Sequence, residues 1–214
     1  MNYIKYPRTF HLPWSEGVKK DDKVLDNVKH FQNKRVVITA KMDGENTTLY
    51  KNYFHARSLD SQHHSSQSWI KNFHAKMKYK IPNNWRICGE NLYAEHKIHY
   101  DNLLSYFLVF SIWNNKNMCI SWTHTKKVAK YLNLELVSVL YDGLWDERTI
   151  EKIYGETYQG DECEGYVVRL HDEFAYDDFK NSCAKFVSKK FSDNINEKHW
   201  RDGPIIKNGL RVWE

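Results

Sequence analysis

The sequence predicts an α+β domain of largely antiparallel sheets flanked by helices. Apolar runs of strand length outnumber segments with helical periodicity, and the two kinds do not alternate regularly along the chain. The chain has 214 residues, four prolines and no repeat or low-complexity linker. We therefore expect one domain over residues 1–214, with segments 1–30 and 192–214 of uncertain structure.

The strands are the clearest elements, because β-branched and aromatic residues cluster in short apolar runs. Strands are expected at residues 35–40, 46–50, 85–93, 103–113, 134–141, 164–170 and 183–191. The run at 103–113 is almost entirely apolar, which indicates a strand buried on both faces. Asp43 and Gly44 separate the first two strands and are typical of a tight hairpin turn.

Helices are fewer and shorter. They are expected at residues 66–80, 123–134 and 146–155. Ser66 or Ser68 is expected to cap the first helix and a threonine the second. Gly155 is expected to end the third helix.

Composition limits the possible classes of protein. A formal net charge of +5 permits an anionic partner without requiring one. The four cysteines form no C-x-x-C pair, which favours reduced thiols in a cytoplasmic protein. No signal peptide and no apolar run of membrane-spanning length is present, so no membrane association is expected.

The stretch KMDGEN at residues 41–46 raises a question about Lys41. In one interpretation, Lys41 is a strand end beside a hairpin, with its ammonium in water. In the other, it is a nucleophile, which requires a neutral amine. For that interpretation we expect partial burial and neighbouring cations, namely Arg57, Arg169, Lys185 and a bound metal, to lower its pKa.

Other chemically capable residues follow Lys41 in a fixed order. Each sits in a short motif on or beside an expected strand. They are Arg57 in HARS, Glu90 in CGEN, Phe110 in FLVFSIW, Glu164 and Arg169 in EGYVVR, and Lys185 in AKFV. Taken singly, each has a structural interpretation: Phe110 as core, Glu90 and Glu164 as exposed strand ends, and Arg57 as a surface residue.

This ordered set resembles the covalent nucleotidyltransferase superfamily of RNA ligases, DNA ligases and mRNA capping enzymes. It is most similar to ATP-dependent RNA ligases of the RNA ligase 2-like branch, including small phage enzymes. The resemblance runs from TFHLPWSEG at 9–17 to KHW at 198–200. It implies a nucleotidyltransferase (ATP-grasp-like) fold. Because 27 residues follow Val187, no OB domain is expected.

The resemblance also implies a reaction. The lysine of K-x-D-G attacks the α-phosphorus of ATP, pyrophosphate leaves, and a lysyl-AMP forms. AMP then passes to an RNA 5′-phosphate, and a 3′-hydroxyl displaces it. The cofactors implied are ATP and Mg²⁺ or Mn²⁺. The partners implied are RNA ends, with an end-healing kinase or phosphatase, in a bacterial or phage-infected cytoplasm.

Site roles follow by matching motifs. Lys41 is the nucleophile, and Asp43 with Gly44 forms the turn that holds it. Asn46 helps to organise the site. Glu164 holds the metal, directly or through water.

The remaining motif residues are implied to contact the nucleotide. Ala40 lies against it, Glu90 accepts hydrogen bonds from the ribose, and Phe110 stacks on adenine. Arg57 binds a phosphate of the nucleotide or of the RNA 5′ end. Arg169 and Lys185 bind phosphates.

The sequence departs from the family pattern at several positions. Val187 stands where a second lysine of the last motif is common. Strand alternation suggests Lys189 as its substitute, and the alternative is that Lys189 is a solvated lysine. Ser111 stands where many relatives carry aspartate after the stacking aromatic. Strict alternation also puts Glu164 and Arg169 on opposite faces, so at least one of them must lie at a bend or strand end.

Three alternatives remain open at this point. The first is an mRNA-capping-type guanylyltransferase. The second is a non-catalytic module that binds nucleotide or RNA on the same fold. The third is a domain that adenylates itself but needs a partner to capture RNA.

Overall fold

Two sheets form the framework in the computed structural model, which describes residues 3–60, 64–153, 163–193 and 203–212. The five-stranded sheet has the order β1-β12-β10-β2-β9. Its strands are β1 (Phe10–His11), β2 (Arg35–Lys41), β9 (Val139–Leu144), β10 (Gly165–Leu170) and β12 (Cys183–Val187). Neighbours in this sheet are antiparallel, apart from the parallel pair of β1 and β12.

The seven-stranded sheet has the order β11-β7-β6-β5-β3-β4, with β8 beside β6. Its strands are β3 (Glu45–Leu49), β4 (Phe54–Ala56), β5 (Arg86–Asn91), β6 (Phe107–Trp113), β7 (Met118–Cys119), β8 (Glu135–Leu136) and β11 (Phe174–Ala175). β8 runs parallel to β6, and the other pairs are antiparallel.

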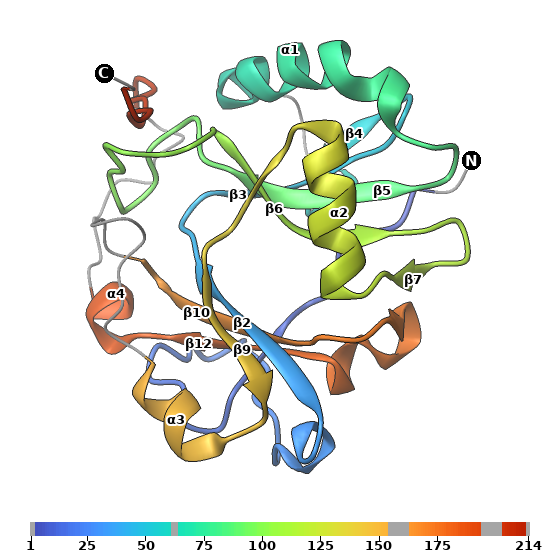
Figure 1. Cartoon of the computed structure of the whole chain (residues 1–214). Coiled ribbons are helices and arrows are strands. Elements are labelled where there is room, and N and C mark those ends of the chain that lie inside the picture. The colour runs from blue at the N-terminus through green and yellow to red at the C-terminus, as the bar shows by residue number, and fades with distance from the viewer. Residues whose placement is uncertain (1–2, 61–63, 154–162, 194–202, 213–214) are drawn as a thin grey trace.

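The helices lie outside the sheets. They are α1 (Ser68–Met77), α2 (Trp122–Leu132), α3 (Glu147–Lys152) and α4 (Lys189–Asp193). Short 3₁₀ turns occur at Lys29–Phe31, Ser65–Gln67, Lys78–Lys80 and Tyr176–Asn181. In Figure 1, α1 lies at one end of the molecule and α3 at the other, with the strands between them. None of the helices within the described ranges has the length and apolar composition that a membrane crossing requires.

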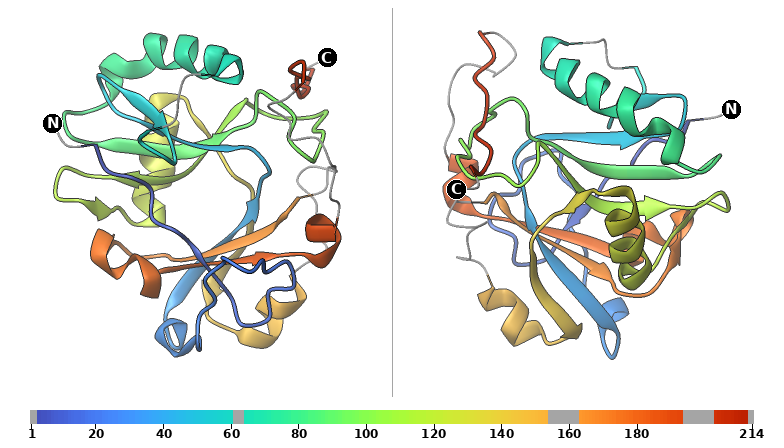
Figure 2. Two further views of the ribbon diagram at one scale, coloured as in Figure 1. Left: turned by 180° about the vertical axis from the view of Figure 1, so that it is seen from behind. Right: turned by 45° about the horizontal axis from the view of Figure 1, so that its top comes forward.

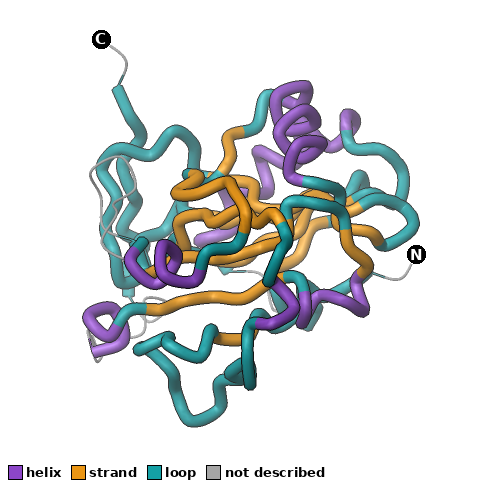
Figure 3. Tube along the Cα trace, turned by 60° about the horizontal axis from the view of Figure 1, so that its bottom comes forward, coloured by secondary structure: helices purple, strands orange, loops and turns teal. Residues whose placement is uncertain are grey.

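Apolar side chains form a layered core. Ile70 of α1 and Leu132 of α2 pack on Phe107 of the seven-stranded sheet. On the outer face of the five-stranded sheet, the N-terminal segment and α3 pack in the same way, with Phe31 and Ile150 fully buried. The strands therefore occupy the centre of the fold, as Figures 2 and 3 show.

Strands β2 and β3 do not form the hairpin that Asp43 and Gly44 predicted. β2 pairs with β9 and β10, whereas β3 pairs with β4 and β5 in the other sheet. The Asp-Gly pair is therefore the point where the chain crosses between sheets. Gly44 is needed there because a Cβ would lie 2.6 Å from the carbonyl oxygen of Asn91.

Other predicted boundaries were partly wrong. The strand expected at 134–141 is two strands, because Val137 N–H bonds to Val109 in one sheet and Ala40 N–H to Ser138 in the other. The strand expected at 183–191 ends at Val187, and α4 follows. The strand expected at 103–113 begins at Phe107.

The predicted helix caps were also wrong. The Ser121 side chain, not a threonine, accepts from the backbone N–H of His124 at the start of α2. α1 has no side-chain cap. Gly155, expected to end the third helix, lies outside the described residues.

Candidate active site

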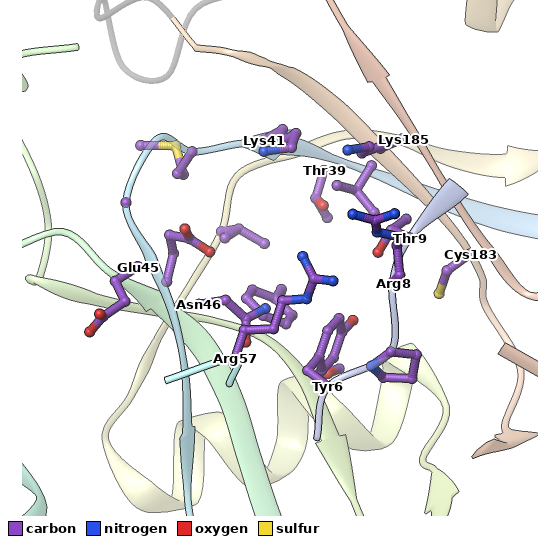
Figure 4. A pocket seen from close by; sticks show the side chains of 18 of the residues that line it. Tyr6, Arg8, Thr9, Thr39, Lys41, Glu45, Asn46, Arg57, Cys183 and Lys185 are labelled. Atoms are coloured by element: carbon purple, nitrogen blue, oxygen red, sulfur yellow. The ribbon is translucent and has the colours of Figure 1, made fainter. Parts of the chain in front are cut away.

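A pocket of about 710 Å³ lies between the two sheets. β2, β10 and β12 contribute one wall, and β3, β5 and β6 contribute the other. Residues 6–9 of the N-terminal segment close one side. In Figure 4, Lys41 and Lys185 lie along the wall of the five-stranded sheet, with Asn46 and Arg57 across from them. Ala40, in the same wall as Lys41, is almost fully buried.

Lys41 ends β2 and forms an ion pair with Glu164. Glu164 directly precedes β10, and its N–H bonds to the carbonyl oxygen of Lys41 at 3.0 Å. Gly165, the next residue, pairs with Lys41 on one side and Val187 on the other. A Cβ at Gly165 would lie 2.1 Å from the carbonyl oxygen of Phe186, so glycine allows the three strands to close around the pair.

The charges around Lys41 differ from the prediction. Burial lowers the pKa of the Lys41 ammonium, but the carboxylates of Glu164 and Glu90 outweigh burial, and the pKa is raised above its ordinary value. The prediction that the protein's own charges lower the pKa of Lys41 is therefore wrong. The pKa of Glu90 is raised to about 8, because burial of its carboxyl group outweighs the lowering effect of the Lys41 charge.

Asp43 is not among the residues that line the pocket. Its carboxylate accepts hydrogen bonds from the backbone N–H groups of Lys97 (2.7 Å) and Ile98 (2.9 Å). Its own N–H donates to the hydroxyl of Tyr100 at 2.9 Å. These three bonds attach the turn after Lys41 to the loop at residues 97–100. Asp43 therefore fixes the backbone directly after Lys41.

Asn46 and Glu90 face each other across β3 and β5. Both side chains line the pocket. Oδ1 of Asn46 is buried and, among the described residues, has no hydrogen-bond partner. A buried polar atom without a partner is costly, so this oxygen is suited to accept a hydrogen bond from a ligand.

A β-bulge presents Phe110 to the pocket. Cys88 pairs with Ser111 and Gly89 with Val109, so Phe110 is the extra residue on β6. Bulges redirect side chains, and Phe110 and Ser111 accordingly line the pocket in succession. The ring of Tyr6 packs edge-on against Phe110, with ring centroids 5.2 Å apart.

Arg169 lies in the pocket wall, but its guanidinium is bound to the backbone. It donates to the carbonyl oxygens of Phe110 (3.3 Å) and Ile120 (2.8 Å). Its side chain is 4% exposed and also lies over the ring of Trp122. This arrangement favours a role in fixing the Phe110 bulge over the predicted phosphate contact. Strict alternation required Glu164 or Arg169 to lie at a bend or at a strand end. Glu164 meets this requirement, because it lies just before β10, the strand that carries Arg169.

Lys185 projects into the pocket from β12. Its ammonium lies 3.6 Å from the carboxylate of Asp22. Burial lowers the pKa of Lys185, and the nearby charge of Lys41 lowers it further. Asp22 also lies 3.3 Å from Nε2 of the buried His11.

The suggestion that Lys189 replaces a second lysine is wrong. The strand ends at Val187, so the alternation that would carry residue 189 into the pocket does not continue. Lys189 is exposed at the start of α4 and does not line the pocket.

Sequence reasoning missed the contribution of the N-terminal segment. Tyr6, Arg8, Thr9 and Asp22 all line the pocket. The resemblance to RNA ligases begins at residue 9, directly after Arg8. That position was the signal in the sequence that could have pointed to this segment. The parallel pairing of β1 with β12, which brings this segment to Lys185, cannot be inferred from local pattern.

Comparison with known proteins identifies the family of the chain. The family model described as RNA ligase matches residues 34–187. This range contains Lys41, Glu90, Phe110, Glu164 and Lys185. A search among curated proteins finds no match.

Solved structures share the fold. Two are alanine mutants of the Naegleria gruberi RNA ligase, one with ATP and Mn and one with AMP and Mn. Each superposes with a TM-score of 0.60 at 14% identity over 92% of this chain, covering 64% and 66% of those chains. An archaeal ATP-dependent RNA ligase superposes with a TM-score of 0.56 at 12% identity, over 88% of this chain and 49% of that one.

These structures confirm the predicted α+β class and its nucleotidyltransferase fold. The chain spans between 49% and 66% of the length of these three structures. At this level of identity, the likeness concerns the fold alone.

Proposed function

The chain belongs to the RNA ligase family, and we propose that it joins RNA ends in an ATP-dependent reaction through a covalent lysyl-AMP intermediate. One observation carries the proposal. Lys41 stands in a pocket of about 710 Å³, paired with Glu164 and facing Asn46, Glu90 and Phe110. An amine, acceptor groups for a sugar, and an aromatic ring therefore share a space large enough for a nucleotide.

In the first step, the neutral Nζ of Lys41 attacks the α-phosphorus of ATP. A nitrogen–phosphorus bond forms, the bond to the β-phosphate oxygen breaks, and pyrophosphate leaves. Lys41 must lose a proton first, because its raised pKa means that the surrounding carboxylates hold it as an ammonium. Glu164 keeps that ammonium in position at the end of β2.

The carboxylates near Lys41 fit a divalent cation. Oxygen donors are those that Mg²⁺ and Mn²⁺ prefer, and Glu164, Glu90 and Asp43 all act electrostatically on Lys41. Within the described ranges, no cluster of three such groups could ligate a metal directly. We therefore assign Glu164 to a cation through its bound water. A cation there would lower the pKa of Lys41 and offset phosphate charge.

The nucleoside is assigned to the wall formed by β3, β5 and β6. Phe110 stacks on the base, because the bulge turns its ring into the pocket. Glu90 accepts hydrogen bonds from the ribose, and Asn46 offers its unpartnered Oδ1. Ala40 forms part of the opposite wall.

In the later steps, AMP passes from Lys41 to the 5′-phosphate of an RNA strand, and a 3′-hydroxyl then displaces AMP to form the phosphodiester. Lys185 and Arg57 are assigned to phosphate contacts, because both project into the pocket. The substrate ends must carry a 5′-phosphate and a 3′-hydroxyl. A kinase or phosphatase activity that prepares such ends is therefore a functional partner in this proposal.

The test is incubation with α-³²P-labelled ATP, or in parallel GTP, with Mg²⁺ or Mn²⁺, followed by denaturing electrophoresis. We expect an acid-labile protein band from ATP that is absent from a folded Lys41→Ala variant. Lys126→Ala, which changes an exposed lysine on α2, is the matched control and should label normally. Label from GTP alone would indicate a capping-type guanylyltransferase. No label from either nucleotide would indicate a binding module.

A further inference from the structure

Arg8 brings a second guanidinium to the pocket, next to Arg57. The segment that carries Arg8 is fixed on both sides. Before it, Tyr6 packs against the rings of Phe110 and Phe179, with centroids 5.2 Å and 5.3 Å away. After it, Phe10 begins β1 and pairs with Ala184 of β12. Arg8 is therefore held at the pocket and does not belong to a free terminus.

The two guanidinium groups converge from different elements. Arg57 follows β4 on the seven-stranded sheet, and Arg8 precedes β1 on the five-stranded sheet. Both line the pocket, and Figure 4 shows both side chains projecting into it. Burial lowers the pKa of Arg57, and the positive charge of Arg8 lowers it further. The two cations are thus close enough to repel each other.

Carboxylates offset this repulsion only in part. Arg8 donates to the carbonyl oxygen of Asp21 (2.8 Å) and to its carboxylate (3.4 Å), which is 79% exposed. An ion pair this exposed to solvent does little to offset the repulsion between Arg8 and Arg57. Within residues 3–60, 64–153, 163–193 and 203–212, Arg57 forms no ion pair. By contrast, Lys41 and Lys185 each have a carboxylate partner, Glu164 and Asp22.

We propose that Arg8 and Arg57 together form a subsite for a phosphate group other than the α-phosphate that Lys41 attacks. A phosphate carries enough negative charge to match both cations, and guanidinium groups bind it through paired hydrogen bonds. The inference rests on the proposed function, and the new element is Arg8 with its N-terminal segment. The phosphate belongs either to the pyrophosphate end of ATP or to the 5′ end of an RNA strand.

Equilibrium binding tests the subsite without requiring any reaction. Inorganic pyrophosphate, a 5′-phosphorylated oligoribonucleotide and its 5′-hydroxyl counterpart would each be titrated into the full chain and its Arg8→Ala variant. Arg148→Ala, on the exposed surface of α3, is the matched control. Removing a charge-assisted hydrogen bond to a phosphate weakens binding by about tenfold or more. Arg8→Lys keeps the positive charge at this position. Its affinity for the phosphate probes should therefore lie between that of the unaltered chain and that of Arg8→Ala.

The results separate the two sources. Weaker pyrophosphate binding in Arg8→Ala assigns the subsite to ATP. Weaker binding of the 5′-phosphorylated strand alone, with the 5′-hydroxyl strand unchanged, assigns it to RNA. Equal binding by Arg8→Ala and Arg148→Ala of every probe, with unchanged Tm, would overturn the proposal, as would failure of the unaltered chain to bind either phosphate. A chain that binds these probes through Arg8 but never labels itself with ATP would instead contradict the ligase assignment.

Discussion

The hydroxyl of Tyr100 accepts a hydrogen bond from the backbone N–H of Asp43, at 2.9 Å, in the turn that follows Lys41. Tyr100 is itself fixed from the far end of the chain. Oδ1 of Asn208 accepts from its backbone N–H at 2.9 Å, and Gly209 N–H donates to its carbonyl oxygen at 2.6 Å. The turn that follows Lys41 is therefore supported by a chain of hydrogen bonds that reaches residue 209.

Tyr100→Phe should loosen this support. The buried N–H of Asp43 would lose its partner, at a cost of roughly 1–3 kcal/mol. We expect a lower Tm and slower labelling of Lys41 by ATP. Tyr131→Phe, on a side chain that is 82% exposed, is the control and should change neither quantity. Equal Tm and equal labelling in the two variants would show that the Tyr100 hydroxyl contributes nothing.

Glu164→Gln should lower the pKa of Lys41. The negative charge of Glu164 is the strongest of the influences that raise this pKa, so its removal favours the neutral amine at lower pH. The measurement is reductive methylation of Lys41 against pH, read by mass spectrometry without nucleotide or metal. The midpoint should move to lower pH in Glu164→Gln and stay in place in Glu147→Gln, an exposed site on α3. A midpoint that moves upward contradicts the electrostatic account.

Phe110→Ala should raise the KM for ATP. Removing a stacking aromatic costs about 1–3 kcal/mol per base, which corresponds to a rise in KM of roughly fivefold to 150-fold. Phe110→Tyr keeps the ring and should keep the KM near its original value. If Phe110→Ala lowers Tm but leaves the KM unchanged, Phe110 serves only as a packing partner of Tyr6.

His11 should make the fold sensitive to acid. Burial lowers the pKa of His11 to about 4, against 6.5 for an unperturbed histidine. The unfolded chain therefore takes up this proton first, and stability is lost as pH falls from about 6.5 towards 4. His11→Asn should show a smaller drop in Tm across this range. Exposed His124→Asn should follow the unaltered chain, and an equally steep drop in His11→Asn would exclude this role.

Much of the site could be predicted because its residues sit in short motifs on strands. The alternation of β12 carries Cys183 and Lys185 to the pocket and Ala184 to the core, as period-two patterning requires. Lys41 and Glu164, which the ordered motifs place in one site, form an ion pair.

The features that could not be predicted from the sequence depend on contacts between segments that are distant along the chain. The Asp43–Gly44 step has the composition of a hairpin, and only the partners of β2 and β3 reveal that it joins two sheets. The same holds for the raised pKa of Lys41, which depends on Glu90 and Glu164 brought from later strands. Arg8 was missed for a similar reason, because its place depends on the pairing of β1 with β12.

The parallel pairing of β1 with β12 has a consequence for the order in which the chain can fold during its synthesis. Residues 10 and 11 emerge first, yet their partners at 184 and 185 follow almost the whole of both sheets. Pairings of such long sequence separation form slowly, after local elements are in place. A nascent chain that ends before β12 would leave an edge of β10 unpaired, and Lys41 would lack the part of the pocket wall that carries Lys185. Interrupted translation should therefore yield fragments that fold in part but lack a complete pocket around Lys41.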